Sequence, residues 1–146
     1  MPDILVVNGP NMNLLGTREP EHYGTQTLDE LNARLTELGK ELGLKLVFFQ
    51  SNHEGAIIDF IQEQAPNASG MIINAAALSH YSYAIRDAIA AAGIATAEVH
   101  MTNVSNREEF RHHSVLTPVC IGSVTGFGYF GYAMALSYFA DSAGDQ

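Results

Sequence analysis

The stretch DILVVNGP, residues 3–10, decides the fold of this chain. An apolar run at residues 4–7 lies between two polar residues, and a Gly-Pro pair follows it. Short continuous apolar runs of this kind are typical of strands that are buried on both faces, as in a parallel sheet. Similar runs recur at residues 44–50, 70–74, 94–100 and 118–122. The sequence therefore predicts five buried strands.

Helical patterns separate these predicted strands. Residues 27–42 carry leucines at helical spacing, with Thr27 and Glu30 as a capping box and Gly43 as a stop signal. Further helices are expected at residues 51–64, at residues 80–92, in a short segment from Ser105, and at residues 126–140. The helix at residues 51–64 would begin with a capping box of Ser51 and Glu54.

Strand and helix alternate five times, which predicts a parallel sheet with helices on both faces because each crossover must be right-handed. The expected fold class is α/β: a flavodoxin-like three-layer sandwich with a five-stranded parallel sheet in the order 2-1-3-4-5. A chain of 146 residues suits one domain, residues 1–146. Ligands of such sheets bind at the carboxyl ends of the strands, beside the switch point between strands 1 and 3.

Composition excludes several classes of protein. Apolar residues make up 47% of the chain, which rules out disorder, and we expect neither a membrane span nor a signal peptide. A net charge of -9 argues against nucleic acid as a partner. The single cysteine, Cys120, excludes an internal disulfide framework and favours a reducing, cytoplasmic location. Charged residues total only 16%, which suggests that an oligomer hides part of the surface.

The segment after the first predicted strand, residues 9–24, is long for a strand-to-helix connection and is expected to be a binding loop or lid. It contains neither G-x-G-x-x-G nor a P-loop lysine, which argues against nucleotide binding. Arg18 and Tyr23 share this loop. A nearby guanidinium favours the phenolate and would make Tyr23 a base. The alternative is a surface arginine and a packed tyrosine.

Two residues at the end of the fourth predicted strand point the same way, because they are two positions apart. Glu98 can therefore orient the imidazole of His100 and raise its basicity, which would make an acid/base unit, although a purely structural pair is as plausible. His80 opens the next predicted helix, where backbone N–H groups would favour an anionic ligand. It could equally be a capping or core histidine. The histidines show no metal-binding spacing, so no metal site is expected.

Two arginines, Arg107 and Arg111, are spaced to share one face of a short helix and suit a small carboxylate ligand. A local salt bridge to Glu108 is the alternative. Asp87 shares a helix face with His80 but lies about 10 Å along the axis. It is therefore expected to reach the site of another subunit rather than the same ligand.

Together these residues resemble the type II 3-dehydroquinate dehydratases, over almost the whole chain and in the right order. The matching motifs are NGPNMNLLG at residues 8–16, REP at 18–20 with YG at 23–24, QSNHEG at 50–55, IN at 73–74, EVH at 98–100 with Asn103, and REEFRHHS at 107–114. The resemblance implies the same flavodoxin-like fold. It also implies a hydro-lyase that converts 3-dehydroquinate to 3-dehydroshikimate by anti elimination through an enolate, in the shikimate pathway of aromatic amino acid biosynthesis or in quinate catabolism.

The resemblance assigns roles to the catalytic residues. Tyr23 would remove the proton beside the ketone, with Arg18 supporting its phenolate. Asn11 would hold a water that stabilises the enolate. His100 would protonate the leaving hydroxyl, oriented by Glu98.

The resemblance also implies how the substrate, a small carboxylate, is bound. The implied contacts come from Asn74, His80, Arg111, the backbone of Met101 and Thr102, and Asp87 of a neighbouring subunit. Members of the family assemble as dodecamers built from trimers, and they require neither a metal nor an organic cofactor.

The chain departs from the family pattern in a few places. The family usually has Asn-Pro and Thr-His-Thr-Ser where this sequence has Asn74-Ala75 and Ser79-His80-Tyr81-Ser82, and Thr102 replaces a serine. Two other functions stay open: a flavodoxin-like module that binds a flavin or nucleotide, and an altered relative that acts on another β-hydroxy ketone.

Overall fold

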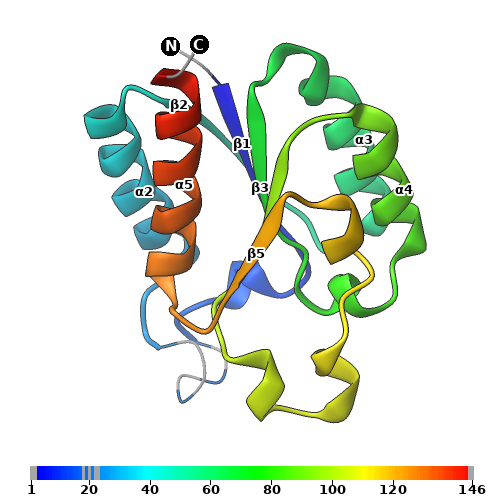
Figure 1. Ribbon diagram of the computed structural model, residues 1–146. Coiled ribbons are helices and arrows are strands. Elements are labelled where there is room, and N and C mark those ends of the chain that lie inside the picture. Colours follow the sequence, from blue (N-terminus) through cyan, green and yellow to red (C-terminus); the bar gives the residue numbers. More distant parts are fainter. Residues whose placement is uncertain (1–2, 18, 20, 22–23, 145–146) are drawn as a thin grey trace.

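The computed structural model describes residues 3–17, 19, 21 and 24–144 (Figure 1). Its centre is an all-parallel sheet of five strands in the order β2-β1-β3-β4-β5, which confirms the predicted fold class and strand order. The strands are β1 (Asp3–Asn8), β2 (Lys45–Gln50), β3 (Gly70–Asn74), β4 (Thr96–His100) and β5 (Gly122–Thr125).

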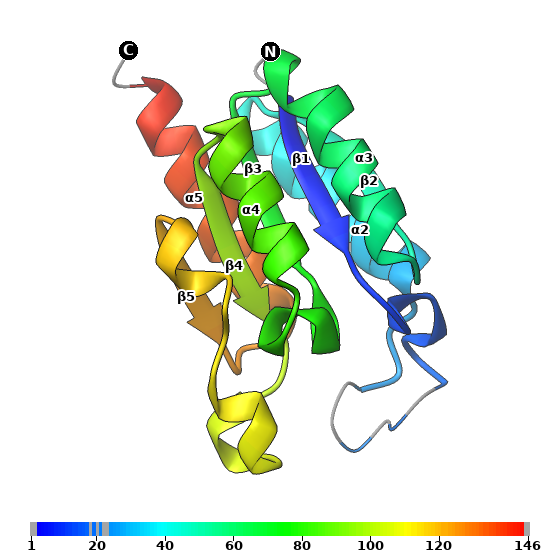
Figure 2. The ribbon, with the colours of Figure 1, turned by 90° about the vertical axis from the view of Figure 1, so that its right-hand side faces the viewer.

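In the part of the chain that the structure describes, four α-helices cover the two faces of the sheet. They are α2 (Leu28–Leu42), α3 (Glu54–Gln64), α4 (Tyr83–Ala92) and α5 (Tyr129–Gly144). Helices α2 and α5 lie on one face and α3 and α4 on the other (Figures 1 and 2). None of the helices in the described part of the chain is long and apolar enough to cross a membrane.

The alternation of side chains along the strands divides the core into two layers. In β1, Ile4 and Val6 pack with α2 and α5, whereas Leu5 and Val7 pack with α3 and α4. All four side chains are buried, as expected for a parallel sheet covered on both sides.

The first predicted helix is confirmed with its capping. The hydroxyl of Thr27 accepts a hydrogen bond from the backbone N–H of Glu30, and the Glu30 carboxylate accepts one from the backbone N–H of Thr27. Gly43 ends the helix in the left-handed conformation, at φ 75°.

The second predicted capping box is wrong. His53 is the N-cap of α3 and makes no side-chain cap hydrogen bond. The Ser51 hydroxyl accepts from the backbone N–H of His53 at 2.9 Å instead. The Glu54 carboxylate instead accepts a short hydrogen bond from the hydroxyl of Ser82, the N-cap of α4.

The fifth strand and the helix expected at residues 80–92 begin later than predicted. Pro118 lies in a 3₁₀ turn, η6 (Thr117–Val119), because proline has no N–H to donate to a strand ladder, and β5 starts at Gly122. Residues Ala76–His80 form the 3₁₀ turn η3, and Ser82 then caps α4 by accepting from Ile85 N–H.

Two further helix predictions need correction. The short helix expected from Ser105 is replaced by two 3₁₀ turns, η4 (Val104–Asn106) and η5 (Glu109–His112). The last helix starts at Tyr129 because Gly126 and Gly128 take φ values of 98° and 54°, which an α-helix does not contain. The 3₁₀ turns η1 (Met12–Leu14) and η2 (Ala65–Asn67) complete the set.

A glycine at the start of β3 permits the close packing of α5. A Cβ atom at Gly70 would lie 2.6 Å from the buried ring of Phe139. We expect Gly70→Ala to destabilise the fold by roughly 1–3 kcal/mol, because the buried ring cannot move aside. Urea unfolding measures the change. Gly122→Ala is the matched control, since a Cβ at Gly122 meets nothing within 4 Å, and equal losses in both variants would contradict the packing argument.

Candidate active site

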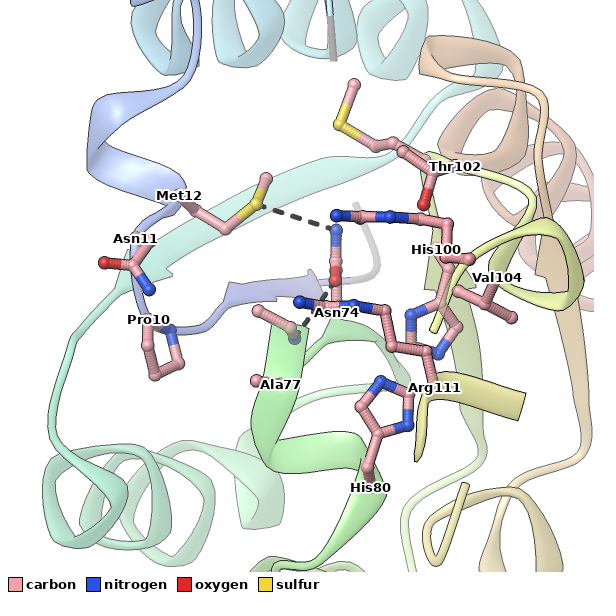
Figure 3. A pocket seen from close by; sticks show the side chains of 13 residues that line it. Pro10, Asn11, Met12, Asn74, Ala77, His80, His100, Thr102, Val104 and Arg111 are labelled. Atoms are coloured by element: carbon pink, nitrogen blue, oxygen red, sulfur yellow. Dashed lines mark hydrogen bonds between the residues drawn. The ribbon is translucent and has the colours of Figure 1, made fainter. Parts of the chain in front are cut away.

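A pocket opens where β1, β3 and β4 end, at the switch point that the strand order predicts (Figure 3). The space between its lining atoms is about 520 Å³ when the open mouth is included. The sequence-predicted residues that line it are Asn11, Asn74, His80, His100, Met101, Thr102, Arg107 and Arg111.

Two other predicted residues, Glu98 and Asp87, lie elsewhere. Glu98 lies behind His100, in a second depression that adjoins the pocket. Asp87 is exposed on α4 and does not line the pocket of its own chain. Arg18 and Tyr23 lie outside the described residues.

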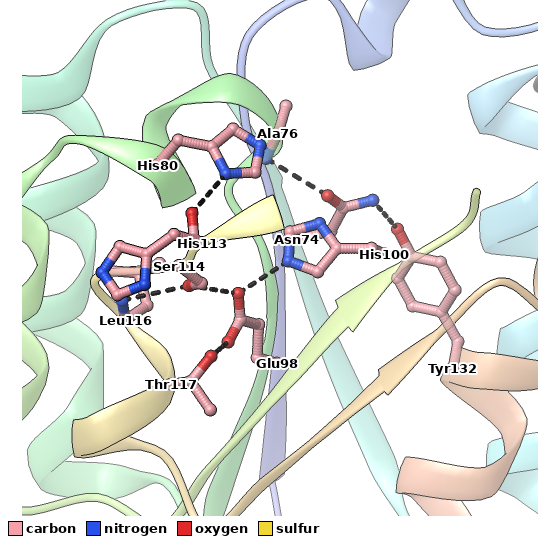
Figure 4. A network of polar contacts seen from close by, with 10 residues as sticks. All are labelled: Asn74, Ala76, His80, Glu98, His100, His113, Ser114, Leu116, Thr117 and Tyr132. Carbon is pink, nitrogen blue, oxygen red and sulfur yellow. Dashed lines mark hydrogen bonds and ion pairs between the residues drawn. The ribbon is translucent and has the colours of Figure 1, made fainter. Parts of the chain in front are cut away.

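The pair predicted at the end of β4 is formed. The Nε2 atom of His100 donates to Glu98 Oε2 at 2.6 Å, and both side chains are buried. The Glu98 carboxylate also accepts from the hydroxyl of Ser114 at 2.6 Å and from that of Thr117 at 2.5 Å (Figure 4). Because Nε2 of His100 is hydrogen-bonded to the carboxylate, Nδ1 is the ring nitrogen that can bind a ligand.

The three donors decide the charge of Glu98. Burial by itself would raise the pKa of this carboxyl, but the hydrogen bonds from His100, Ser114 and Thr117 outweigh burial and lower its pKa below the ordinary value. The carboxylate therefore stays ionised beside the Nε2 atom of His100.

His80 faces His100 across the pocket. The rings stack with centroids 6.1 Å apart, and Nδ1 of His80 donates to the backbone oxygen of His113 at 2.8 Å. Burial lowers the pKa of His80, and the neighbouring His100 and Arg111 lower it further, against the raising effects of the His113 carbonyl and Glu98. His80 ends the turn η3 rather than opening a helix, so the predicted help from helix N–H groups is wrong.

Two arginines reach the pocket from separate segments. Arg111 lies in η5 and Arg107 just before it, so the prediction that the two share one face of a helix is wrong. Both arginines nevertheless line the pocket. The Nε atom of Arg111 donates to the Glu108 carboxylate at 2.5 Å, so the alternative of a local salt bridge is also realised. The Arg107 guanidinium is largely buried and lies 3.8 Å from the Glu19 carboxylate.

The sequence interpretation missed a buried hydroxyl beneath the pocket. Tyr132 of α5 is fully buried; its hydroxyl donates to Asn8 Oδ1 at 2.6 Å and accepts from Asn74 Nδ2 at 2.9 Å. Asn74 Oδ1 accepts from the backbone N–H of Ala76, which fixes the other end of the amide. A tyrosine in the middle of an apolar helix was the available signal, since a buried hydroxyl needs a partner.

Residues of the QSNHEG motif hold the other side of the pocket. The Asn52 side-chain oxygen accepts from the backbone N–H of Asn11 at 2.9 Å, and Gln50 donates to the Gly9 carbonyl at 3.1 Å. Asn11 and Ala76 line the pocket with positive φ values of 69° and 53°. Strained backbone of this kind concentrates at functional sites.

The geometry brings together an acid/base pair, a second imidazole and a guanidinium around a small pocket. Within the described residues, no three His, Cys, Asp or Glu side chains converge as a metal ion would require. The arrangement suits proton transfer to or from a small anionic ligand.

Comparisons with known proteins agree with this interpretation. Residues 2–140 match the family described as Dehydroquinase class II. The chain is 51% identical to the 3-dehydroquinate dehydratase of Bacillus licheniformis, over 97% of this chain and 98% of the relative. It is 48% identical to that of Bacillus subtilis, over 100% of this chain and 99% of the relative.

Solved structures show the same relationship. The crystal structure of type II dehydroquinase from Butyrivibrio crossotus superposes with a TM-score of 0.92 at 49% identity, covering 94% of this chain and 97% of the other. A 3-dehydroquinate dehydratase-like protein from Bifidobacterium longum gives a TM-score of 0.75 at 32% identity, with 98% of each chain covered.

The lowered pKa of Glu98 predicts how stability depends on pH. The unfolded state binds more protons near this carboxyl's ordinary pKa of 4.5, so Glu98 stabilises the fold above that pH. The stabilisation is lost as pH falls through the lower folded-state pKa.

We therefore expect Glu98→Gln to lower the free energy of unfolding at neutral pH, with the difference from the parent shrinking below pH 4.5. Urea unfolding between neutral and acid pH measures it. Glu37→Gln, at a carboxylate that is 73% exposed, is the matched control and should change little. A Glu98→Gln deficit that stays constant down to acid pH would contradict the assigned ionisation.

Proposed function

The chain belongs to the class II dehydroquinase family, and on that premise we propose that it dehydrates 3-dehydroquinate to 3-dehydroshikimate. The observation that carries the proposal is the buried Glu98–His100 pair, joined at 2.6 Å, whose free Nδ1 faces a pocket lined by His80 and Arg111. An elimination of water needs an acid for the departing hydroxyl, and this pair can supply one.

The pocket suits a small hydroxylated carboxylate. Arg111 brings a guanidinium, which suits a carboxylate or hydroxyl oxygen, and Asn74 and His80 bring further polar atoms. The backbone of Met101 and Thr102 lines the same pocket directly after β4 and completes the proposed set of substrate contacts.

The proposed base is Tyr23, with Arg18 beside it. Both come from the family motif and lie outside the described residues. The pKa of a free tyrosine is about 10, so a phenolate at neutral pH requires roughly 4 kcal/mol of stabilisation, which a close guanidinium in a dry site helps to provide. The phenolate removes the proton beside the ketone, and an enolate results.

Residues at opposite sides of the pocket stabilise the enolate and protonate the leaving group. Asn11, held by Asn52, holds the water that stabilises the enolate oxygen. His100 protonates the departing β-hydroxyl from Nδ1 and is left neutral, while Glu98 stabilises the imidazolium before transfer. A proton beside a ketone is acidic enough for this route, so the proposal includes neither a metal nor an organic cofactor.

We also propose that the protein is a cytoplasmic single-domain enzyme that assembles as a dodecamer, a tetramer of trimers. Exposed apolar side chains support an oligomer: Phe130, Met134 and Tyr138 form a stripe along α5, with exposed fractions of 60%, 46% and 54%. Tyr83 on α4 is 66% exposed and lies one helical turn before Asp87. A subunit that covers Tyr83 would also bring Asp87 to the interface.

The dehydratase proposal predicts the behaviour of two variants. His100→Ala and Tyr23→Phe should each lower kcat by about 10²-fold or more, because each removes a proton-transfer group. Absorbance of the conjugated product formed from 3-dehydroquinate, without added metal and after exhaustive chelation, measures the rate. His53→Ala, at an exposed histidine, is the matched control. Near-normal turnover by a folded Tyr23→Phe variant would refute the assigned base, and a chelator-sensitive rate would point to a metal.

The assembly proposal predicts that Asp87 acts between subunits. Asp87→Ala and Tyr23→Phe chains, each inactive alone, should regain activity after subunit exchange, because some mixed sites then contain both intact residues. Light scattering checks assembly, and an active monomer contradicts it. Absence of recovery after verified exchange would mean that Asp87 acts within its own chain or away from the site.

A further inference from the structure

One short segment, residues 113–117, contacts the imidazole of His80 and the carboxylate that holds the imidazole of His100 (Figure 4). The backbone oxygen of His113 accepts from His80 Nδ1, and the hydroxyls of Ser114 and Thr117 donate to Glu98, which holds His100. The backbone N–H of Val115 donates to the carbonyl of Ser79 at 2.8 Å, which ties the segment to the turn that carries His80.

The two hydroxyls contact different oxygens of the same carboxylate. Ser114 donates to Oε2, the oxygen that also accepts from His100, whereas Thr117 donates to Oε1. The Ser114 oxygen accepts from the backbone N–H of Leu116 at 3.1 Å, and this bond leaves the hydroxyl proton for Glu98. Both hydroxyls therefore share with His100 the negative charge of one buried carboxylate.

We propose that Ser114 and Thr117 are positioning residues that act through Glu98 to set the acid strength of His100. Each hydroxyl draws carboxylate charge away from the imidazolium and so weakens the hold of Glu98 on the His100 proton. Without the hydroxyls, Glu98 would bind that proton more tightly and His100 would be a weaker acid. The role in catalysis rests on the proposed function, because it takes His100 as the acid.

The other titratable groups that the structure describes around the pair do not account for such an effect. Burial lowers the pKa of His80 below its ordinary value of 6.5, so His80 does not titrate in the alkaline range. Burial raises the pKa of Cys120 to about 12. Arginines stay charged throughout. Among the described residues, the remaining charged or titratable groups that line the two depressions are Arg107, Arg111 and His112, and β5 contributes Ser123 and Thr125.

The test removes the hydroxyls while keeping the shape of the site. In Thr117→Val, in Ser114→Ala and in the double variant, we expect the alkaline limb of the kcat profile to move to higher pH. The expected shift is about 0.5–1 unit for a single variant and more for the double variant. KM should change little. Thr117→Ser restores a hydroxyl and should restore the parent profile, and Thr36→Val on α2 is the control for loss of a threonine hydroxyl elsewhere.

A second readout does not depend on dehydratase activity. NMR titration of the His100 imidazole, assigned by comparison with His100→Ala, should show the same upward shift in Thr117→Val. Thr117 is exposed, so this variant keeps the test available even if the double variant fails to fold.

The outcomes separate the two proposals. A shifted imidazole titration in a protein that does not dehydrate 3-dehydroquinate would support the positioning role and overturn the proposed function. The contrary result is that folded variants keep the alkaline limb of the kcat profile and the His100 titration of the parent, while kcat is lowered equally at every pH. That result would show that the two hydroxyls are structural and would overturn the positioning role.

Discussion

The carboxylate of Glu98 is buried at the end of β4, and burial of an ionised carboxylate is strongly unfavourable unless donors surround it. Three side chains provide the donors, and two of them come from the segment between η5 and β5. That segment must therefore return to the sheet at this point. Its backbone then also holds His80, so one buried charge determines where both imidazoles of the pocket lie.

The opposite wall of the pocket depends on how closely β1 and β3 end together. Asn8 and Asn74 are paired in register, and the Tyr132 hydroxyl joins their side chains from below. A Cβ atom at Gly9 would lie 2.5 Å from the Ala75 carbonyl, so only glycine allows this approach. The strained backbone at Asn11 and Ala76 follows directly after these two strand ends, which links the tight packing of the sheet to the shape of the pocket.

The regular part of this structure could be predicted from short patterns. Apolar runs predicted the strands, and local spacing placed Glu98 beside His100, because both patterns depend on neighbouring residues. The strand order followed from the alternation of strands and helices. Prediction was weakest after Asn74, where a 3₁₀ turn precedes a helix that begins later than expected, and after His100, where 3₁₀ turns replace the expected helix. These turns are held by contacts between distant residues, such as Val115 to Ser79, and helical spacing cannot reveal such contacts. Tyr132 was missed for the same reason, since its partners lie 58 and 124 residues away.

The distribution of charge connects the pocket with the rest of the chain. The protein carries a net charge of -9, yet Arg107 and Arg111, two of its seven basic residues, line one small pocket. An anionic ligand is attracted locally although the whole molecule repels it, because nearby charges dominate inside a pocket walled by protein. Glu98 does not oppose this attraction, since its charge lies behind His100 and is shared among three donors. The donors that make burial of the carboxylate tolerable thus also keep its charge from repelling the ligand.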